Sequence, residues 1–137
     1  MAKIICGFPG IGKSSIKNIG KVLDLDSSLY TKNSLFPANY IVDIVSAMDE
    51  YDYILVSTHD VLRKELQSMG ISYTNVYPEI DLGEEYHDRY VQRGSPESFI
   101  NFIDENWDDF IYELQYDDSE YVELESGQFL SDIIANI

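Results

Sequence analysis

The sequence predicts an α/β fold, a three-layer α/β/α sandwich on a mostly parallel sheet of about five strands. Short apolar runs of strand length alternate with amphipathic segments of helical length along the 137 residues. That alternation is typical of repeated strand–helix–strand units. A glycine-rich segment, GFPGIGKSS at residues 7–15, follows the first apolar run. We expect a single domain over residues 1–137, because the chain is too short for two ordinary ones.

The strands are predicted from apolar runs and the helices from apolar residues three or four positions apart. The run YILV at residues 53–56 is uninterrupted, as is typical of a central strand covered on both faces. Cys6, the only cysteine, falls in the first strand and is interpreted as a small core residue. The expected strands are 3–6, 21–26, 53–56, 71–78 and 121–124, and the expected helices are 14–19, 40–48, 61–69, 81–93, 96–114 and 128–136.

Local signals predict where the helices begin and end. Asp60 is expected to cap the helix that follows the third strand, and Gly70 to end it. Gly94 ends the next helix, after which Ser95 is expected as a cap with Pro96 at the first helical position. Two apolar stripes are expected to be buried in addition: Tyr40, Ile41, Ile44, Val45 and Met48, and Leu62, Leu66 and Met69. The stripe along the long helix is interpreted as core and consists of Phe99, Ile103, Trp107, Phe110 and Leu114.

The formal net charge of −16 is distributed unevenly. Residues 1–37 carry five lysines and two acidic residues, whereas residues 97–137 carry twelve acidic residues and no lysine or arginine. An anionic ligand is therefore favoured near the glycine-rich segment. The overall charge argues against DNA or RNA as a partner. The sequence contains no apolar run long enough to span a membrane, so we expect no membrane association.

The glycine-rich segment matches the phosphate-binding motif G-x-x-x-x-G-K-[ST] completely. Glycines allow backbone N–H groups to turn toward a polyphosphate, and the N-terminus of a following helix adds further donors. Lys13 is expected to reach the β- and γ-phosphates, and the Ser14 hydroxyl to bind Mg²⁺. The predicted nucleotide-binding residues are Gly7, Phe8, Pro9, Gly10, Ile11, Gly12, Lys13, Ser14 and Ser15.

The order of these parts resembles the compact P-loop kinases of the nucleoside monophosphate kinase group, whose superfamily also includes shikimate and gluconate kinases. It is also similar to small predicted nucleotide kinases of bacteriophages. The resemblance covers nearly the whole chain, with the loop (Walker A) as its specific motif. It implies a P-loop NTPase fold, ATP and Mg²⁺ as cofactors, an acceptor-binding segment at residues 27–37 and a lid at residues 81–94. The D-G-x-P-R acceptor signature of the group is missing after the third strand.

The resemblance also implies roles for residues that follow the second and third strands. Kinases of this group that phosphorylate hydroxyls carry an acidic pair spaced like Asp24 and Asp26. One member orients the acceptor or acts as the base, and the other touches the magnesium shell. Asp26 is equally open to a role as a local cap or turn residue. His59, after the third strand, and Tyr30, in the segment 27–37, are candidate ligands of the acceptor, although structural roles for both stay open.

The three arginines of the chain lie where kinases of this group keep arginines that bind phosphate. Arg63 resembles a ligand of the acceptor, whereas Arg89 and Arg93 lie four residues apart in the expected lid. A planar guanidinium suits a transferring phosphoryl group because it can donate two hydrogen bonds at once. Surface ion pairs with neighbouring carboxylates are the structural alternative for each arginine.

These observations predict a Mg²⁺- and ATP-dependent kinase that transfers a phosphoryl group to a small nucleotide or nucleoside in the cytoplasm, the host cytoplasm if a phage encodes it. Two alternatives stay open: a kinase of small-metabolite hydroxyls, and a nucleotide-binding regulatory module without turnover. The expected catalytic residues are Lys13, Asp26, Arg89 and Arg93, the acceptor-binding residues Asp24, Asp26, Tyr30, His59 and Arg63, and the metal ligands Ser14 and Asp24.

Overall fold

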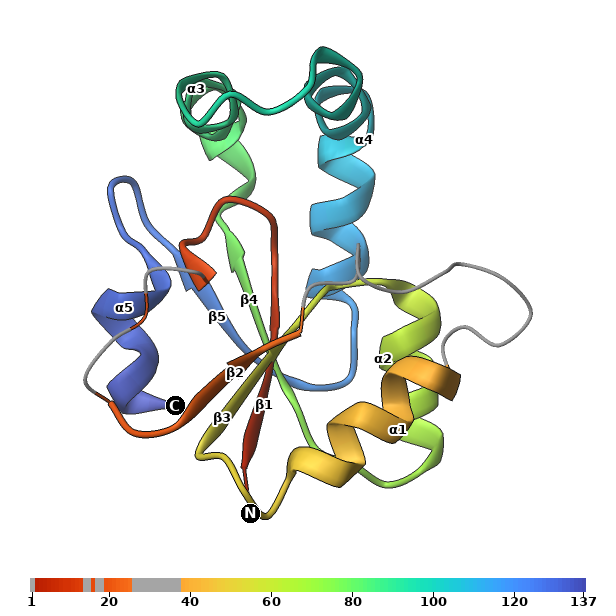
Figure 1. The fold of residues 1–137 in the computed structure, drawn as a ribbon. Coiled ribbons are helices and arrows are strands. Elements are labelled where there is room, and N and C mark those ends of the chain that lie inside the picture. Colours follow the sequence, from red (N-terminus) through yellow and green to blue (C-terminus); the bar gives the residue numbers. More distant parts are fainter. Residues whose placement is uncertain (1, 14–15, 17–18, 26–37) are drawn as a thin grey trace.

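The structure, a computed structural model, describes residues 2–13, 16, 19–25 and 38–137. Within these residues the centre of the fold is a five-stranded sheet in which all neighbouring strands are parallel, in the order β2-β3-β1-β4-β5 (Figure 1). The predicted α/β class and parallel sheet are confirmed. The strands are β1 (Lys3–Gly7), β2 (Val22–Asp24), β3 (Tyr53–Val56), β4 (Thr74–Pro78) and β5 (Glu120–Leu124).

Helices flank both faces of this sheet and also extend beyond the carboxyl ends of its strands (Figure 1). Two helices, α1 and α2, pack on one face, and α5 lies on the other. The helices α3 and α4 stand next to each other beyond the carboxyl ends of the strands. The helical elements are α1 (Ala38–Ala47), α2 (Asp60–Ser68), α3 (Gly83–Gln92), α4 (Glu97–Gln115) and α5 (Leu130–Ile133), with 3₁₀ turns at η3 (Ile80–Leu82) and η4 (Ile134–Asn136).

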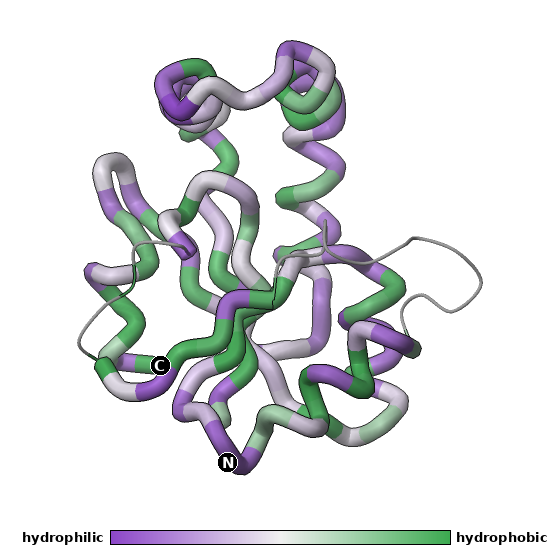
Figure 2. The backbone as a smooth tube through the Cα atoms, viewed as in Figure 1, coloured by the Kyte–Doolittle hydropathy of each residue, from purple (hydrophilic) through white to green (hydrophobic). Residues whose placement is uncertain are grey.

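The neighbouring strands β1 and β3 contribute side chains to two separate hydrophobic cores, because successive strand residues point to opposite faces of the sheet. Ile5 and Leu55 join the core formed with α3, α4 and α5. Ile4 and Ile54 join the core beneath α1 and α2. Cys6 is buried in the second core as predicted, and its burial raises the thiol pKa to about 12. Figure 2 shows the hydrophobic segments converging on the sheet from both sides.

Several predicted helix starts are wrong by one or two residues. Asp60 is the first residue of α2 and not its cap, and its carboxylate accepts a hydrogen bond from the Val61 N–H at 2.9 Å. Pro96 lies just outside α4, because its extended backbone (φ −59°, ψ 144°) makes Glu97 the first helical residue. The expected Ser95 cap is not formed.

Some predicted spans and stripes also differ from the structure. The second strand is shorter than expected and the last helix breaks into α5 and η4, while most of the expected helix 14–19 lies outside the described residues. Val45 on α1 and Met69 after α2 are exposed and not buried. Phe99 and Phe110 are only half-buried, unlike the rest of their stripe. None of the described helices is long and apolar enough to cross a bilayer.

A buried polar network joins α2, β4 and the end of α4. The Asp117 carboxylate accepts hydrogen bonds from Tyr73 and Asn75, each at 2.7 Å, and lies 3.2 Å from the guanidinium of Arg63. The side chains of Arg63 and Asp117 are 6% and 7% exposed. Burial opposes ionisation of Asp117, but these hydrogen bonds and the arginine charge outweigh it and hold its pKa below the usual range.

We expect Asp117→Asn to lower the free energy of unfolding by about 3 kcal/mol, because it removes the charge that compensates a buried arginine. Urea denaturation at pH 7 measures this loss. Asp118→Asn is the matched control, since Asp118 is the exposed next residue, and it should change stability by less than about 0.5 kcal/mol.

The pH dependence of the same variants identifies the charge as the cause. A carboxylate whose pKa is lowered by folding stabilises the protein above its unfolded pKa of about 4, and this contribution is lost as the pH falls through the folded pKa. The stability difference between the wild type and Asp117→Asn should therefore shrink below about pH 4. A difference that stays constant down to pH 2.5 would mean that the charge of Asp117 contributes nothing.

Candidate phosphate-binding loop and cavity

The carbonyl groups of residues 7–11, at the end of β1 and in the loop after it, all accept hydrogen bonds. The donors to the successive carbonyls of residues 7–11 are Lys13 Nζ (2.9 Å), the Ile11 N–H (3.4 Å), the Tyr90 hydroxyl (2.7 Å), the Arg89 guanidinium (2.9 Å) and the Leu130 N–H (2.8 Å). In contrast, the N–H groups of Gly10 and Gly12 make no hydrogen bond to the described part of the chain. Over residues 7–12 the described part of the chain thus leaves these two N–H groups as donors without a partner, which suits an anion.

Two glycines of the loop are required by backbone conformation and by packing. Gly10 and Gly12 have φ of 93° and 90°, a region that other residues rarely adopt. A Cβ atom at Gly10 would come within 3.0 Å of the Tyr90 ring, and one at Gly12 within 3.1 Å of the Phe129 ring. The motif therefore has a structural reason here: aromatic rings from α3 and from the segment before α5 press directly on the loop.

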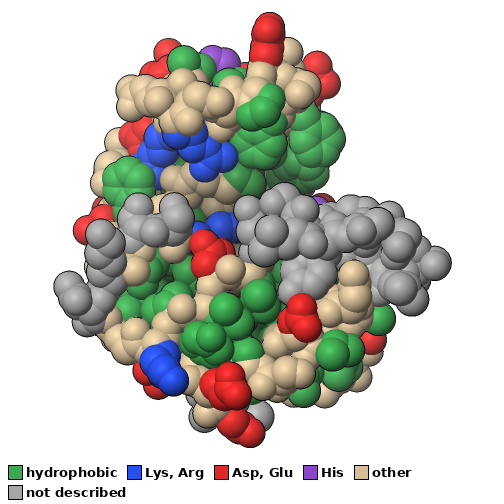
Figure 3. Space-filling model, in the orientation of Figure 1, with side chains coloured by type: hydrophobic (Ala, Val, Ile, Leu, Met, Phe, Trp, Pro, Cys, Tyr) green, Lys and Arg blue, Asp and Glu red, His purple; other side chains and the backbone are tan. Residues whose placement is uncertain are grey.

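A cavity of about 670 Å³ opens beside the loop, at the carboxyl ends of β1, β2 and β3. Parallel α/β sheets commonly bind ligands at this edge. One wall consists of the loop and of polar residues that follow the strands. The opposite wall comes from α4 and includes the rings of Phe99, Phe102 and Phe110. Figure 3 shows hydrophobic and basic side chains gathered on the α3–α4 part of the molecule, above the sheet.

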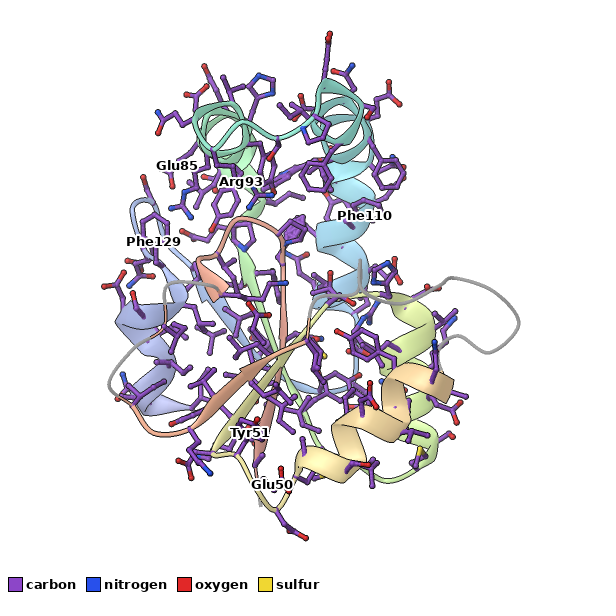
Figure 4. All side chains as sticks on the ribbon, in the orientation of Figure 1. Glu50, Tyr51, Glu85, Arg93, Phe110 and Phe129 are labelled. Atoms are coloured by element: carbon purple, nitrogen blue, oxygen red, sulfur yellow. The ribbon has the colours of Figure 1, made fainter. Side chains whose placement is uncertain are left out.

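Arg89 holds the loop and does not line the cavity. Its guanidinium donates to the carbonyls of Gly10 (2.9 Å) and Gln128 (3.1 Å) and pairs with Glu85 at 3.1 Å. It also lies between two aromatic rings, 4.2 Å from the centroid of Tyr86 and 4.1 Å from that of Phe129. Glu85 and Phe129 lie on the α5 side of the molecule, whereas Arg93 and Phe110 lie toward α4 (Figure 4). The predicted catalytic role of Arg89 stays a prediction. In this structure the guanidinium forms its hydrogen bonds and its ion pair with other residues of the protein.

Glu85 connects the same arginine to the turn before α5. Its carboxylate accepts hydrogen bonds from the Ser126 hydroxyl and from the Gly127 N–H. These hydrogen bonds, with a further contribution from Arg89, outweigh the opposing effect of burial and lower the pKa of Glu85. The carboxylate is therefore ionised at neutral pH, and it joins the turn, α3 and, through Arg89, the loop.

Arg63 lines the cavity, but its charge is already compensated. It pairs with Glu113 at 2.7 Å and with Asp117 at 3.2 Å, and its Nε donates to the Thr58 carbonyl at 3.1 Å. The side chain is buried. Its predicted role as a ligand of the acceptor stays a prediction, and its partners give it a structural role.

Arg93 is the arginine of the expected lid that faces the cavity. It follows the last turn of α3, is exposed, and donates from Nε to the Ser95 hydroxyl at 2.8 Å. Its guanidinium lies 4.9 Å from the ring centroid of Tyr90 and 5.6 Å from that of Phe99. Within the described ranges no carboxylate lies at ion-pair distance from Arg93, so its charge is available to a ligand.

The structure brings some of the other predicted residues to the cavity. Lys13, Asp24 and His59 all line it, and His59 Nδ1 lies 2.7 Å from the Ser57 hydroxyl. The predictions for Ser14, Ser15, Asp26 and Tyr30, and for the segment 27–37, fall outside the described residues. Among described side chains, no group of three His, Cys, Asp or Glu could hold a metal ion.

Sequence analysis missed the contribution of α4 to the cavity. Phe99 and Phe110 were interpreted as core, and Phe102, which is 54% exposed, was not singled out. The available signal was Phe102 itself, an aromatic residue three positions after Phe99 and beside Ile103, which widens the apolar stripe on one side of the helix. Phe102 therefore faces the cavity beside the buried Ile103.

Comparisons with protein families, with curated proteins and with solved structures find no match to this chain. The fold class and the geometry of the loop and cavity are thus the basis for any functional conclusion.

Arg89 and Arg93 should differ in their effect on stability. We expect Arg89→Ala to lower the free energy of unfolding by about 2 kcal/mol, because it removes hydrogen bonds from a largely buried charged group and leaves Glu85 without its pair. Arg93→Ala, at an exposed position four residues away, should change it by less than about 0.5 kcal/mol. Urea denaturation of both variants measures the difference. Equal losses would contradict the division of roles between them.

Proposed function

We propose that this chain is a P-loop kinase that transfers the γ-phosphoryl group of ATP to a small acceptor in the cavity beside the loop. The observation that carries the proposal is the hydrogen bonding of the loop: the carbonyls of residues 7–11 accept hydrogen bonds, whereas the N–H groups of Gly10 and Gly12 donate none to the described residues. Lys13 adds a positive charge at the same place. A loop with spare donors and a lysine is suited to the phosphates of a nucleotide.

The fold supports the same interpretation. The complete loop motif follows β1, which lies at the centre of the sheet between β3 and β4. The cavity lies at the carboxyl edge of that sheet, where the loop borders it directly. A triphosphate bound by the loop would therefore present its terminal group to an acceptor in the cavity.

The proposed reaction breaks the bond between the γ-phosphorus and its bridging oxygen and forms a bond from the γ-phosphorus to an acceptor oxygen. The electron pair of the broken bond stays on ADP. An acceptor hydroxyl loses its proton to a carboxylate, the role predicted for Asp26, which lies outside the described residues, whereas an acceptor phosphate is already ionised. Lys13 and Arg93 stabilise the negative charge that spreads over the transferred group, and this charge stabilisation supplies most of the rate.

Mg²⁺ fits this site, since it usually binds phosphate oxygens with only one or two protein carboxylates. Asp24 at the cavity supplies such a carboxylate, and Ser14, outside the described residues, is the predicted hydroxyl ligand. When bound, the ion would neutralise part of the charge on the phosphates.

We expect Lys13→Ala to lower phosphoryl transfer by about 100-fold or more while the protein stays folded, because it removes the charge that stabilises the transferred group. The assay uses Mg²⁺, labelled ATP and pooled nucleosides, nucleoside monophosphates and sugars, and it follows the label. Lys64→Ala is the control, because Lys64 lies exposed on α2 and does not line the cavity.

Near-normal transfer by Lys13→Ala would contradict the kinase assignment. Binding of ATP by the wild type without any formation of ADP across the whole pool would replace it with the regulatory module.

A further inference from the structure

The α4 wall of the cavity carries aromatic rings that a purely polar ligand would leave without an apolar contact. Phe99, Phe102 and Phe110 line the cavity along one side of the helix, and the rings of Phe102 and Phe110 lie 5.5 Å apart. Phe102 is 54% exposed although Ile103 beside it is buried. Exposed rings on a cavity wall gain free energy when an apolar or planar group covers them.

The wall also carries a hydrogen-bond acceptor at a fixed position. Glu113 lines the cavity one turn beyond Phe110, and its Oε1 accepts a hydrogen bond from Arg63 at 2.7 Å. A carboxylate can accept several hydrogen bonds at once. Glu113 can therefore accept an N–H from a ring that lies on the phenylalanines, a combination that suits a nucleobase.

The charges around the cavity argue against a second phosphorylated ligand. Asp24, Asp60 and Glu113 line it, and Asp60 lies 3.8 Å from the Lys64 ammonium. The positive charge of Arg63 is shared between Glu113 and Asp117. Lys13 belongs to the loop and to the donor phosphates. Of the described cations that line the cavity, Arg93 alone has no carboxylate partner and is not assigned to the donor phosphates. An acceptor that brings its own phosphate would add its negative charge to that of the bound triphosphate, with only Arg93 among the described lining residues to offset it.

We propose that the acceptor is an uncharged compound with a planar heterocyclic ring and a free hydroxyl, of the nucleoside class, and not a nucleoside monophosphate. This inference rests on the proposed kinase function and names its substrate class. The ring stacks on the α4 phenylalanines, and its hydroxyl oxygen forms the new bond to the γ-phosphorus. The hydroxyl proton passes to a carboxylate, and ADP leaves with the electron pair of the broken bond.

Calorimetric titration of the whole chain, with excess Mg²⁺ and ADP to fill the loop site, tests this proposal. The titrants are adenosine, guanosine, cytidine, uridine and thymidine and their 5′-monophosphates. At least one nucleoside should bind more tightly than its own monophosphate. Phe102→Ala should weaken that binding about tenfold, because base–aromatic stacking is lost. Tyr116→Ala is the matched control, since Tyr116 follows α4, is 85% exposed and does not line the cavity.

Three results would overturn the proposal: monophosphates that bind as tightly as nucleosides, nucleoside binding that Phe102→Ala leaves unchanged, or no nucleoside binding to a protein that binds ADP. None of these would affect the kinase assignment if Lys13-dependent transfer is found. Conversely, nucleoside binding that depends on Phe102, without transfer from ATP, would support the nucleoside site and contradict the proposed reaction.

Discussion

The hydrogen bonds that engage the carbonyls of residues 7–11 are the constraint on which the rest of the site depends. Because Tyr90, Arg89 and the Leu130 N–H supply three of these bonds, the loop is held from α3 and α5 as well as from β1. A loop of glycines would otherwise be conformationally free. Held in this way, it keeps its unused N–H groups in place for a ligand, so binding phosphate need not first order the backbone.

The three arginines have different surroundings and therefore different roles. Arg63 is buried with two carboxylates, Arg89 is stacked and bonded against the loop, and only Arg93 faces the cavity without an acidic partner among the described residues. A guanidinium can serve all these roles because it is planar and always charged. In a chain with a net charge of −16, leaving one arginine uncompensated at the cavity concentrates the positive charge where an anion would bind.

The sequence was sufficient to predict the parallel α/β fold and the position of the loop, because both depend on local patterns: apolar runs, helical spacing and a complete motif. It was not sufficient to separate Arg89 from Arg93. The two lie four residues apart, Arg89 in α3 and Arg93 just after it. The difference between them comes from Gly10, Gln128 and Phe129, which are distant in sequence. The aromatic wall was missed for a similar reason, since burial of Phe99 and Phe110 depends on how far α4 extends beyond the sheet.

The central claim is that the backbone N–H groups of the loop bind a polyphosphate. An NMR titration with Mg²⁺–ATP, following the amide signals of Gly10 and Gly12, tests it most directly. The account predicts that both signals shift and saturate together, with a smaller change at Gly70, which follows α2 and does not line the cavity. Unchanged Gly10 and Gly12 signals at saturating nucleotide would contradict it.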